Sequence, residues 1–279
     1  MRLTFYGVRG SIPAPGPHTA KYGGNTACVH VELKNGKHVV LDAGTGTRDL
    51  GEKIADTQEP IYILQTHSHW DHIQGFPFFL PVHQSNRKIY IFSSAVETNA
   101  RLCSMLDQLD GVNFPVKAED LPSVVEWVLD DIEAACERHG IQVSLKPLNH
   151  PAGGSAYRIE EDGVSCVYAT DNELVPPGKP RTSFEEWVNY CREADVLIHD
   201  AQYLDSEMPH KHGWGHSAVS QVWQLALSAQ VKTLVLFHHD PLRTDSELDE
   251  IQVQSEAFFR AHKAQTRVLC SWEGLVIEI

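Results

Sequence analysis

Three histidines and an aspartate lie within six consecutive residues of this chain. They are His67, His69, Asp71 and His72, and they come directly after the apolar run 61–64. This pattern predicts a strand that ends in a loop of metal ligands. On an extended backbone His67 and His69 project to the same side and can bind one metal ion, while Asp71 and His72, beyond a turn, can reach a second. Imidazole and carboxylate ligands without thiolate suit zinc, and manganese or iron are also compatible. The alternative is a solvated cluster of histidines on a loop.

The spacing of these four residues resembles the signature of the metallo-β-lactamase superfamily, in which His-x-His-x-Asp-His follows a hydrophobic strand. The resemblance covers essentially the whole chain and implies further ligands in its second half. His150 would complete the set for the first metal ion, Asp171 would bridge both ions, and His238 would complete the second set. His239 is adjacent, but the family pattern of a strand followed by its ligand favours His238. The implied cofactors are two divalent metal ions, zinc before manganese or iron, held by His67, His69, Asp71, His72, His150, Asp171 and His238.

Two later segments resemble the ribonuclease Z branch of this superfamily. In that branch a His-Glu-Ala motif and a Gly-His-Ser or Gly-His-Thr motif supply an acid and a histidine beside the leaving group. Here residues 199–201 read His-Asp-Ala, with an aspartate in place of the glutamate, and residues 215–217 read Gly-His-Ser. The resemblance implies that His216 protonates the departing oxygen while Asp200 fixes its tautomer. The alternative is that His216 merely precedes a helix whose N-cap is Ser217.

The N-terminal loop 7–17 is too rich in glycine and proline for a regular element, and a second turn follows it. A similar glycine-rich loop occurs in the ribonuclease Z branch. We therefore expect Arg9, Ser11 and Asn25 to line the mouth of the site and to contact substrate. His239, beside the last ligand, is expected to face the substrate as well. The alternative is that the loop is only a rigid connector.

Strand and helix patterns recur in two halves of similar size. Strands are expected at 3–5, 26–33, 39–42, 61–64, 89–92, 142–145, 156–159, 164–170, 196–199, 234–237 and 275–279. Helices are expected at 50–54, 95–106 and 123–139, and after Ser183, Ser217 and Ser246. No linker or low-complexity segment divides the chain. The predicted architecture is therefore an α/β fold, a four-layer αββα metallo-β-lactamase sandwich formed by residues 1–279 as one domain.

Composition limits the partners. The formal net charge is −14 and no basic stripe is visible, so long nucleic acid is disfavoured as a ligand. No apolar run approaches the ~20 residues that a membrane span requires, and we expect no membrane partner. The N-terminal residues lack the pattern of a secretory signal, and the six cysteines form no CxxC pair, so a cytoplasmic protein with buried thiols is expected. The sequence is compatible with a homodimer.

The candidate residues favour hydrolysis. A bound divalent ion lowers the pKa of water from ~15.7 toward ~7 and so supplies a nucleophile. Asp71 is expected to act as a catalytic group as well as a ligand, and Asp42 is expected to hold the metal loop from behind, as the matching aspartate does in the family. The leading hypothesis is a phosphodiesterase for a small phosphodiester such as a cyclic nucleotide. The alternatives are a tRNA 3′-processing nuclease, although no long basic arm is visible, a lactonase or β-lactamase, and a non-catalytic ligand sensor.

Overall fold

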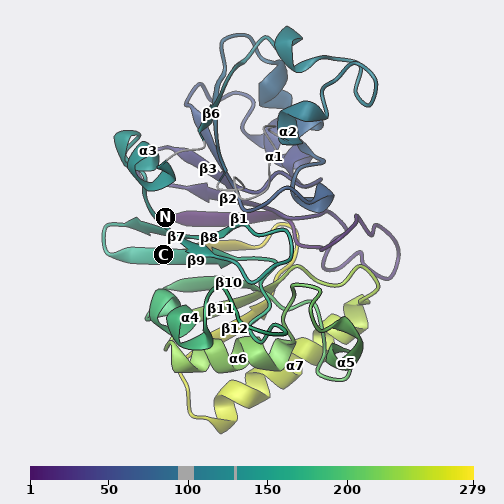
Figure 1. Ribbon diagram of the computed structural model, residues 1–279, viewed down its shortest axis with the longest axis vertical. Helices are drawn as coiled ribbons and strands as arrows, with labels where there is room; N and C mark the ends of the chain where they lie inside the picture. The colour runs from purple at the N-terminus through teal and green to yellow at the C-terminus, as the bar shows by residue number, and fades with distance from the viewer. Residues whose placement is uncertain (94–103, 129–130) are drawn as a thin grey trace.

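Two β-sheets pack face to face in the computed structural model, which describes residues 1–93, 104–128 and 131–279 (Figure 1). The first sheet has the order β13-β1-β2-β3-β4-β5-β6 and the second β12-β11-β10-β9-β8-β7. The strands of the first sheet are β1 (Arg2–Gly7), β2 (Cys28–Glu32), β3 (His38–Leu41), β4 (Ile61–Gln65), β5 (Lys88–Ser93), β6 (Val124–Val128) and β13 (Val276–Glu278). Those of the second are β7 (Gln142–Pro147), β8 (Ser155–Glu161), β9 (Val164–Ala169), β10 (Val196–Asp200), β11 (Thr233–Phe237) and β12 (Arg267–Cys270).

Helices cover the outer faces of both sheets (Figure 1). Those in the described residues are α1 (Thr47–Lys53), α2 (Ser104–Asp107), α3 (Ile132–Arg138), α4 (Phe184–Cys191), α5 (Met208–Lys211), α6 (Val219–Ser228) and α7 (Asp245–Ala261). Helix α7 begins with a capping box between Thr244 and Glu247, and α4 begins with the capping box expected at Ser183. No helix in the described ranges is both long and apolar enough to cross a bilayer.

Three apolar clusters hold these layers together. The central cluster lies between the sheets and joins Phe5 of β1 to Phe237 of β11, whose ring centroids are 6.1 Å apart. A second cluster packs the outer face of the second sheet against α4, α6 and α7, and a third packs the first sheet against α1. The alternation of buried and exposed residues along β1, in which Leu3 and Phe5 face inward, follows from the strand period of two. The predicted four-layer αββα sandwich is confirmed.

Parallel pairing brings the carboxyl ends of several strands to one edge of the sandwich. Strands β3 to β6 are parallel in the first sheet, and β9 to β12 are parallel in the second. Asp42, Asp171 and His238 each lie within two residues of a strand end and adopt positive φ angles of 58°, 53° and 58°. A left-handed residue turns the chain sharply out of the sheet, so these side chains lie at the edge instead of continuing the strand.

One predicted helix is wrong. The stripe of apolar residues over 123–139 suggested a single amphipathic helix, but residues 124–128 form strand β6 and only Ile132–Arg138 are helical, as α3. Strand β6 pairs in parallel with β5, from Lys88 opposite Val124 to Phe92 opposite Val128. Its β-branched valines suit an extended backbone at an open sheet edge, and tertiary pairing outweighs the helical spacing.

The helix expected over 95–106 falls largely on 94–103, which lies outside the described residues. Its last turn is present as α2. Strand β12 was not expected, because residues 267–270 form only a short apolar run next to polar neighbours.

Two buried histidines make the stability of the fold depend on pH. His30 of β2 and His38 of β3 stack at 5.1 Å, and Nε2 of His30 lies 2.9 Å from Nδ1 of His38. Burial, followed by the neighbouring His38, lowers the pKa of His30 to about 3. Below pH ~6.5 the unfolded chain therefore binds a proton at His30 that the folded chain does not bind. The free energy of unfolding consequently falls as the pH is lowered from ~6.5 toward 3.

We expect His30 to lower the free energy of unfolding by about 2 kcal/mol between pH 7 and pH 5, from its linkage alone. Urea unfolding of the metal-free protein at both pH values, compared with a His30→Val/His38→Val double variant, measures this term. The double variant should lose less stability on acidification than the wild type. An identical loss in both proteins would rule the pair out as the source.

Candidate metal centre

Four predicted ligands form one cluster at the carboxyl edge of the sheets. Ligand atoms of His67, His69, His150 and Asp171 all lie within 4.8 Å of one another. Nε2 of His150 is 3.2 Å from Nδ1 of His69, and Nε2 of His67 is 3.5 Å from Oδ2 of Asp171. A tetrahedral zinc ion with bonds of about 2.0–2.2 Å places its ligands about 3.3–3.5 Å apart. We call these four residues the first ligand set.

A second cluster shares Asp171 with the first. It comprises Asp71, His72, Asp171 and His238, which we call the second ligand set. Nε2 of His238 lies 3.0 Å from a carboxylate oxygen of Asp71 and 3.0 Å from one of Asp171. Nε2 of His72 lies 3.2 Å from Oδ1 of Asp171 and 3.2 Å from Nε2 of His238. The two sets together, called the cage below, bring residues from four strand ends to one point.

The hydrogen bonds around the cage turn imidazole lone pairs toward its centre. Nδ1 of His72 donates to Asp42 at 2.8 Å, and Nδ1 of His238 donates to Oε1 of Gln202 at 3.0 Å. Each ring therefore directs its Nε2 into the cage, and these two atoms lie 3.2 Å apart. Nε2 of His67 is buried, and no hydrogen bond from the described residues reaches it. Facing lone pairs and carboxylates repel one another unless a cation lies between them, so the residues fit a pair of divalent ions.

Electrostatics lead to the same conclusion. Burial alone would raise the pKa of Asp171, but His238, His72 and His67 hold it well below its usual range, so the carboxylate stays charged. Burial alone would lower the pKa of His72, but Asp71 and Asp171 raise it well above its usual value. The carboxylates thus draw positive charge to the position that a metal ion would occupy. His67, His72 and His238 are at most 1% exposed, whereas His69 is exposed, so most of the cluster is shielded from solvent and the alternative of a solvated loop cluster is disfavoured.

Supporting side chains orient the ligands from behind. Asp42 accepts hydrogen bonds from His72, from the backbone of Thr66 at 2.8 Å and from the hydroxyl of Tyr168 at 3.0 Å. This is the place expected for Asp42. Gln202, which orients His238, was not anticipated. Gln202 lies two residues after Asp200, so on an extended backbone the two side chains project to the same side. This spacing could have identified Gln202 from the sequence.

His216 lies beside the cage and is oriented by Asp200. Its Nδ1 is 2.8 Å from Oδ2 of Asp200, and its ring centroid is 5.2 Å from that of His238 and 5.6 Å from that of His150. Burial alone would lower the pKa of His216, but the carboxylates of Asp200 and Asp171 raise it to about 9. The side chain of Asp200, although shorter than the glutamate of the family motif, therefore reaches His216.

The segment around His216 is not simply the start of a helix. The N-cap of α6 is Ala218, whereas the hydroxyl of Ser217 donates to the carbonyl of Asn172 and accepts from the backbone of Leu174. The fully buried Glu173 accepts hydrogen bonds from the backbone N–H groups of Gly213 and Gly215 at 2.9–3.0 Å. Glu173, like Gln202, was not anticipated from the sequence. It fixes the loop that delivers His216.

Comparison with known proteins identifies the family. Residues 37–239 match the family described as "Beta-lactamase superfamily domain". The chain belongs to this superfamily. Ribonuclease Z of Halalkalibacterium halodurans is 26% identical over 304 residues, which span 93% of this chain and 94% of the relative. A crystal structure of a metallo-β-lactamase fold protein from Bacillus subtilis has a TM-score of 0.69 at 14% identity, covering 99% of both chains. A diphosphatase of the PhnP family has a TM-score of 0.67 at 18% identity, covering 100% of this chain and 97% of that one.

Gly215 packs directly against His150 of the first ligand set. Gly215 has φ +90°, and a Cβ atom there would lie 2.1 Å from Nδ1 of His150. We expect Gly215→Ala to displace His150 and to weaken metal binding by at least about tenfold. Gly178→Ala is the matched control, because Gly178 has φ +80° and no atom within 4 Å of its added Cβ. Metal content after dialysis measures the difference. Equal retention of metal in both variants would contradict the assigned place of His150.

Three residues expected to contact substrate are turned away from the mouth. The guanidinium of Arg9 is fully buried and donates to backbone carbonyls, while Asn25 donates to Glu273 at 2.6 and 3.2 Å. His239 is 2% exposed and its Nε2 bonds the carbonyl of Ser271 at 3.0 Å. These placements correct the expectation for Arg9, Asn25 and His239, since their polar atoms hold loops together instead of facing the cage.

Ser11 does reach the cage, but through its backbone. Its N–H donates to Oδ2 of Asp71 at 2.7 Å, and its hydroxyl accepts from Nε2 of Gln202 at 3.3 Å. Ser11 has φ 64°, so this contact depends on a left-handed turn in the glycine-rich loop. The glycine-rich loop is therefore both a connector and a contact with the site.

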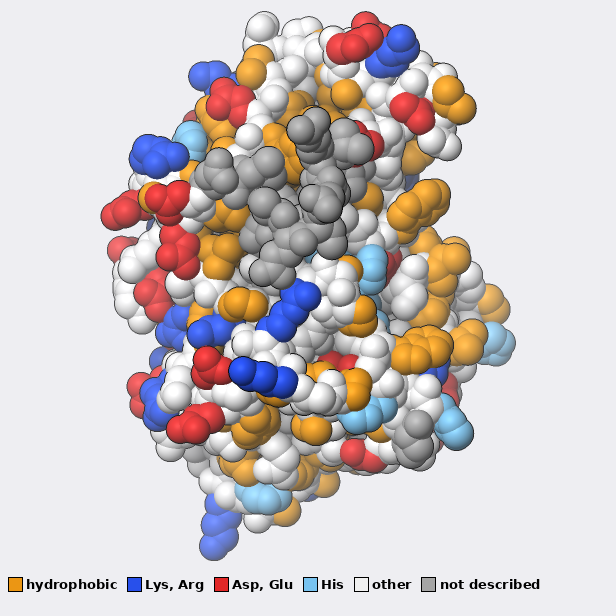
Figure 2. Space-filling model, viewed as in Figure 1, with side chains coloured by type: hydrophobic (Ala, Val, Ile, Leu, Met, Phe, Trp, Pro, Cys, Tyr) orange, Lys and Arg blue, Asp and Glu red, His pale blue; other side chains and the backbone are white. Residues whose placement is uncertain are grey.

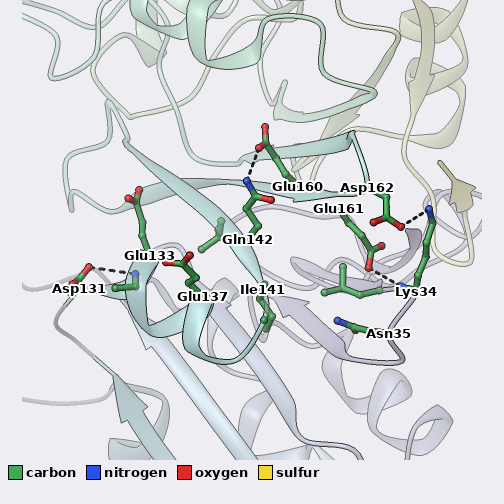
Figure 3. A pocket seen from close by; sticks show the side chains of 14 residues that line it. Lys34, Asn35, Asp131, Glu133, Glu137, Ile141, Gln142, Glu160, Glu161 and Asp162 are labelled. Carbon is green, nitrogen blue, oxygen red and sulfur yellow. Dashed lines mark hydrogen bonds and ion pairs between the residues drawn. The ribbon is translucent and has the colours of Figure 1, made fainter.

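A large hollow lies elsewhere on the molecule and takes no part in the metal centre. Its volume is about 1010 Å³, and its lining includes the acidic residues Glu133, Glu137, Glu160 and Asp162 (Figure 3). It is built from α3, the start of β7 and the end of β8. The other ends of β7 and β8 lie in the cage region. The hollow and the cage are therefore at opposite ends of these two strands.

Proposed function

We propose that this chain is a dinuclear metal-dependent phosphodiesterase that cleaves a small phosphodiester such as a cyclic nucleotide. The observation that carries the proposal is the pair Asp200 and His216, joined at 2.8 Å and packed against the cage. Attack of hydroxide on the phosphorus of a phosphodiester breaks one P–O bond and releases an alkoxide, whose departing oxygen needs a proton. The pair matches the acid and the histidine that the ribonuclease Z branch supplies beside the leaving group of a phosphodiester, which favours this substrate over a lactone or a β-lactam.

Each group of the site has a part in this reaction. The two ligand sets would hold two divalent ions, zinc by preference, which when bound would lower the pKa of water and neutralise the charge of the phosphate. The carboxylates of Asp171 and Asp71 supply negative charge that would offset the positive charge of the ions. The backbone N–H of Ser11 fixes the carboxylate of Asp71 by a hydrogen bond. Nδ1 of His216 is engaged by Asp200, so Nε2 is the atom that delivers a proton to the leaving oxygen.

The second candidate is a nuclease that processes RNA ends. Relatives named ribonuclease Z align with 85% and 93% of this chain at 24% and 26% identity, and this runs against the expectation that long nucleic acid is disfavoured. The net charge of −14 still favours a small substrate, because phosphate backbones bind through lysine and arginine. A cytoplasmic location and a homodimer remain predictions.

Hydrolysis of a substrate panel by the zinc-loaded and manganese-loaded protein tests the proposal. The panel comprises bis(p-nitrophenyl) phosphate, 2′,3′- and 3′,5′-cyclic nucleotides, a precursor tRNA, an acyl-homoserine lactone and a cephalosporin. We expect turnover of the small phosphodiesters. Preferred cleavage of the precursor tRNA would establish the nuclease instead, and hydrolysis of only the lactone or the cephalosporin would overturn both. Binding without turnover of any compound would indicate a ligand sensor.

A further inference from the structure

A second hollow adjoins the metal loop. Its volume is about 490 Å³, and its lining includes Ser68 and Trp70, which alternate with the ligands His67, His69 and Asp71. Ser68 and Trp70 are each the sequence neighbour of a ligand, and consecutive Cα atoms are about 3.8 Å apart. The wall of the hollow therefore begins next to the cage. Its other walls come from the segment after the metal loop and from the segment that follows α2. We call it the aromatic pocket, and its residues in the argument below are Trp70, Phe78, Asp107, Gln108, Asn113 and Phe114.

Exposed aromatic rings give this pocket stacking surfaces. Trp70 is 75% exposed and Phe78 is 60% exposed, although both are large apolar side chains. Phe78 meets Phe114 edge to face at 5.4 Å, which fixes its ring at the wall. Hydrophobic side chains together with histidines also gather along the right-hand edge of the molecule in Figure 2, the side on which the loops at the strand ends lie in Figure 1. Exposed aromatic surface beside a reaction centre suits a planar ligand.

The carboxylate of Asp107 is an exposed acceptor in this pocket. The amide nitrogen of Gln108 already donates to the carbonyls of Ile73 and Met105, and that of Asn113 donates to Asp110. Within the described part of the chain, no hydrogen bond or ion pair reaches the carboxylate of Asp107. A ligand with two adjacent donors therefore matches the two oxygens of this carboxylate.

We propose that the aromatic pocket binds the guanine base of a nucleotide whose phosphate lies at the cage. This rests on the proposed function and names the substrate class of the same site. Guanine presents N1–H and its exocyclic N2 amine side by side, which pair with the two oxygens of Asp107. Adenine and cytosine each present one amine beside an acceptor nitrogen, which the carboxylate repels. Trp70 and Phe78 bind the faces of the base.

Calorimetric titration of the zinc-loaded full-length chain tests the pocket without requiring turnover. The probes are guanosine 5′-monophosphate, adenosine 5′-monophosphate and ribose 5-phosphate. We expect the guanosine nucleotide to bind at least about tenfold more tightly than ribose 5-phosphate, as stacking of one base predicts. Trp70→Ala should remove about tenfold of this affinity and Trp70→Phe should retain most of it. Asp107→Asn should abolish the preference for guanosine over adenosine. Val253→Ala, an exposed change on α7, should alter neither ratio.

A second measurement separates failure of this inference from failure of the proposed function. Guanosine 5′-(p-nitrophenyl phosphate) and methyl p-nitrophenyl phosphate share a leaving group and differ only in the base and sugar. We expect Trp70→Ala to lower the ratio of their kcat/KM values by about tenfold. Hydrolysis of both esters with equal binding of guanosine 5′-monophosphate and ribose 5-phosphate would overturn the pocket and leave the phosphodiesterase standing. Base-dependent binding with no hydrolysis of either ester would support the pocket and overturn the phosphodiesterase.

Discussion

Replacing Asp171 with alanine is expected to abolish metal-dependent hydrolysis and to release both metal ions. Asp171 is the one residue shared by the two ligand sets, and its carboxylate lies 3.0–3.5 Å from the ligand nitrogens of His67, His72 and His238. Its loss therefore removes negative charge and a ligand from both ions at once. The fall in metal affinity should exceed the about 10–100-fold that loss of an outer partner causes. Elemental analysis after dialysis and turnover of bis(p-nitrophenyl) phosphate measure the two effects.

Backbone strain at Asp171 requires its own control. The residue has φ 53°, a conformation that asparagine and aspartate tolerate better than alanine. Asp171→Asn keeps the conformation and removes the charge, so it should also lose metal. Asp162→Ala places alanine at φ 51° in an exposed turn and should keep both ions. Retention of two ions by Asp171→Ala would disprove the bridge, and loss of metal by Asp162→Ala would assign the effect to strain.

Replacing His216 with alanine should slow turnover by about 100-fold or more while leaving the metal content unchanged. His216 contacts the rings of two ligands and forms a third candidate group with Asp200 and His238, but its own Nδ1 is committed to Asp200 and it lies outside the two ligand sets of the cage. The loss should be larger for a nucleoside alkoxide than for p-nitrophenolate, because the better leaving group needs less protonation. Rates for 2′,3′-cyclic nucleotides and for bis(p-nitrophenyl) phosphate give this comparison.

His212 offers a matched control for His216 in the same loop. Its Nε2 bonds the carbonyl of Val175, and its side chain is 46% exposed. His212→Ala should keep both the metal content and the leaving-group dependence of the wild type. If His216→Ala instead loses a metal ion, its proposed role as a proton donor is wrong and it acts as a ligand. A uniform loss of rate for both leaving groups would indicate a structural role.

The sandwich and the converging ligands were predictable because the sequence repeats one local pattern. His67, Asp171 and His238 each follow an apolar strand closely, and parallel strands end at a common edge. Residues at such ends meet even when they are far apart in sequence. The resemblance to the family motif identified which polar residues are candidate ligands. The periodicity of the strands predicted that these residues lie at strand ends.

The errors have physical causes that a single sequence hides. Residues 124–128 carry apolar spacing that suits a helix, and only the open edge of β5 shows that they pair as a strand. Arg9 and His239 sit in loops next to the site, yet burial turns their polar atoms toward backbone carbonyls of neighbouring loops. Gln202 and Glu173 act by orienting other residues, and such contacts depend on the direction of side chains in the folded chain.

The number of metal ions per chain tests the central claim most directly. The protein, loaded with zinc and freed of excess by dialysis, should contain two ions per chain by elemental analysis. Anomalous diffraction from crystals should place one ion within about 2.0–2.2 Å of ligand atoms from the first set and one within the same distance of the second. One ion or none per chain, or ions bound away from Asp171, would contradict the dinuclear cage.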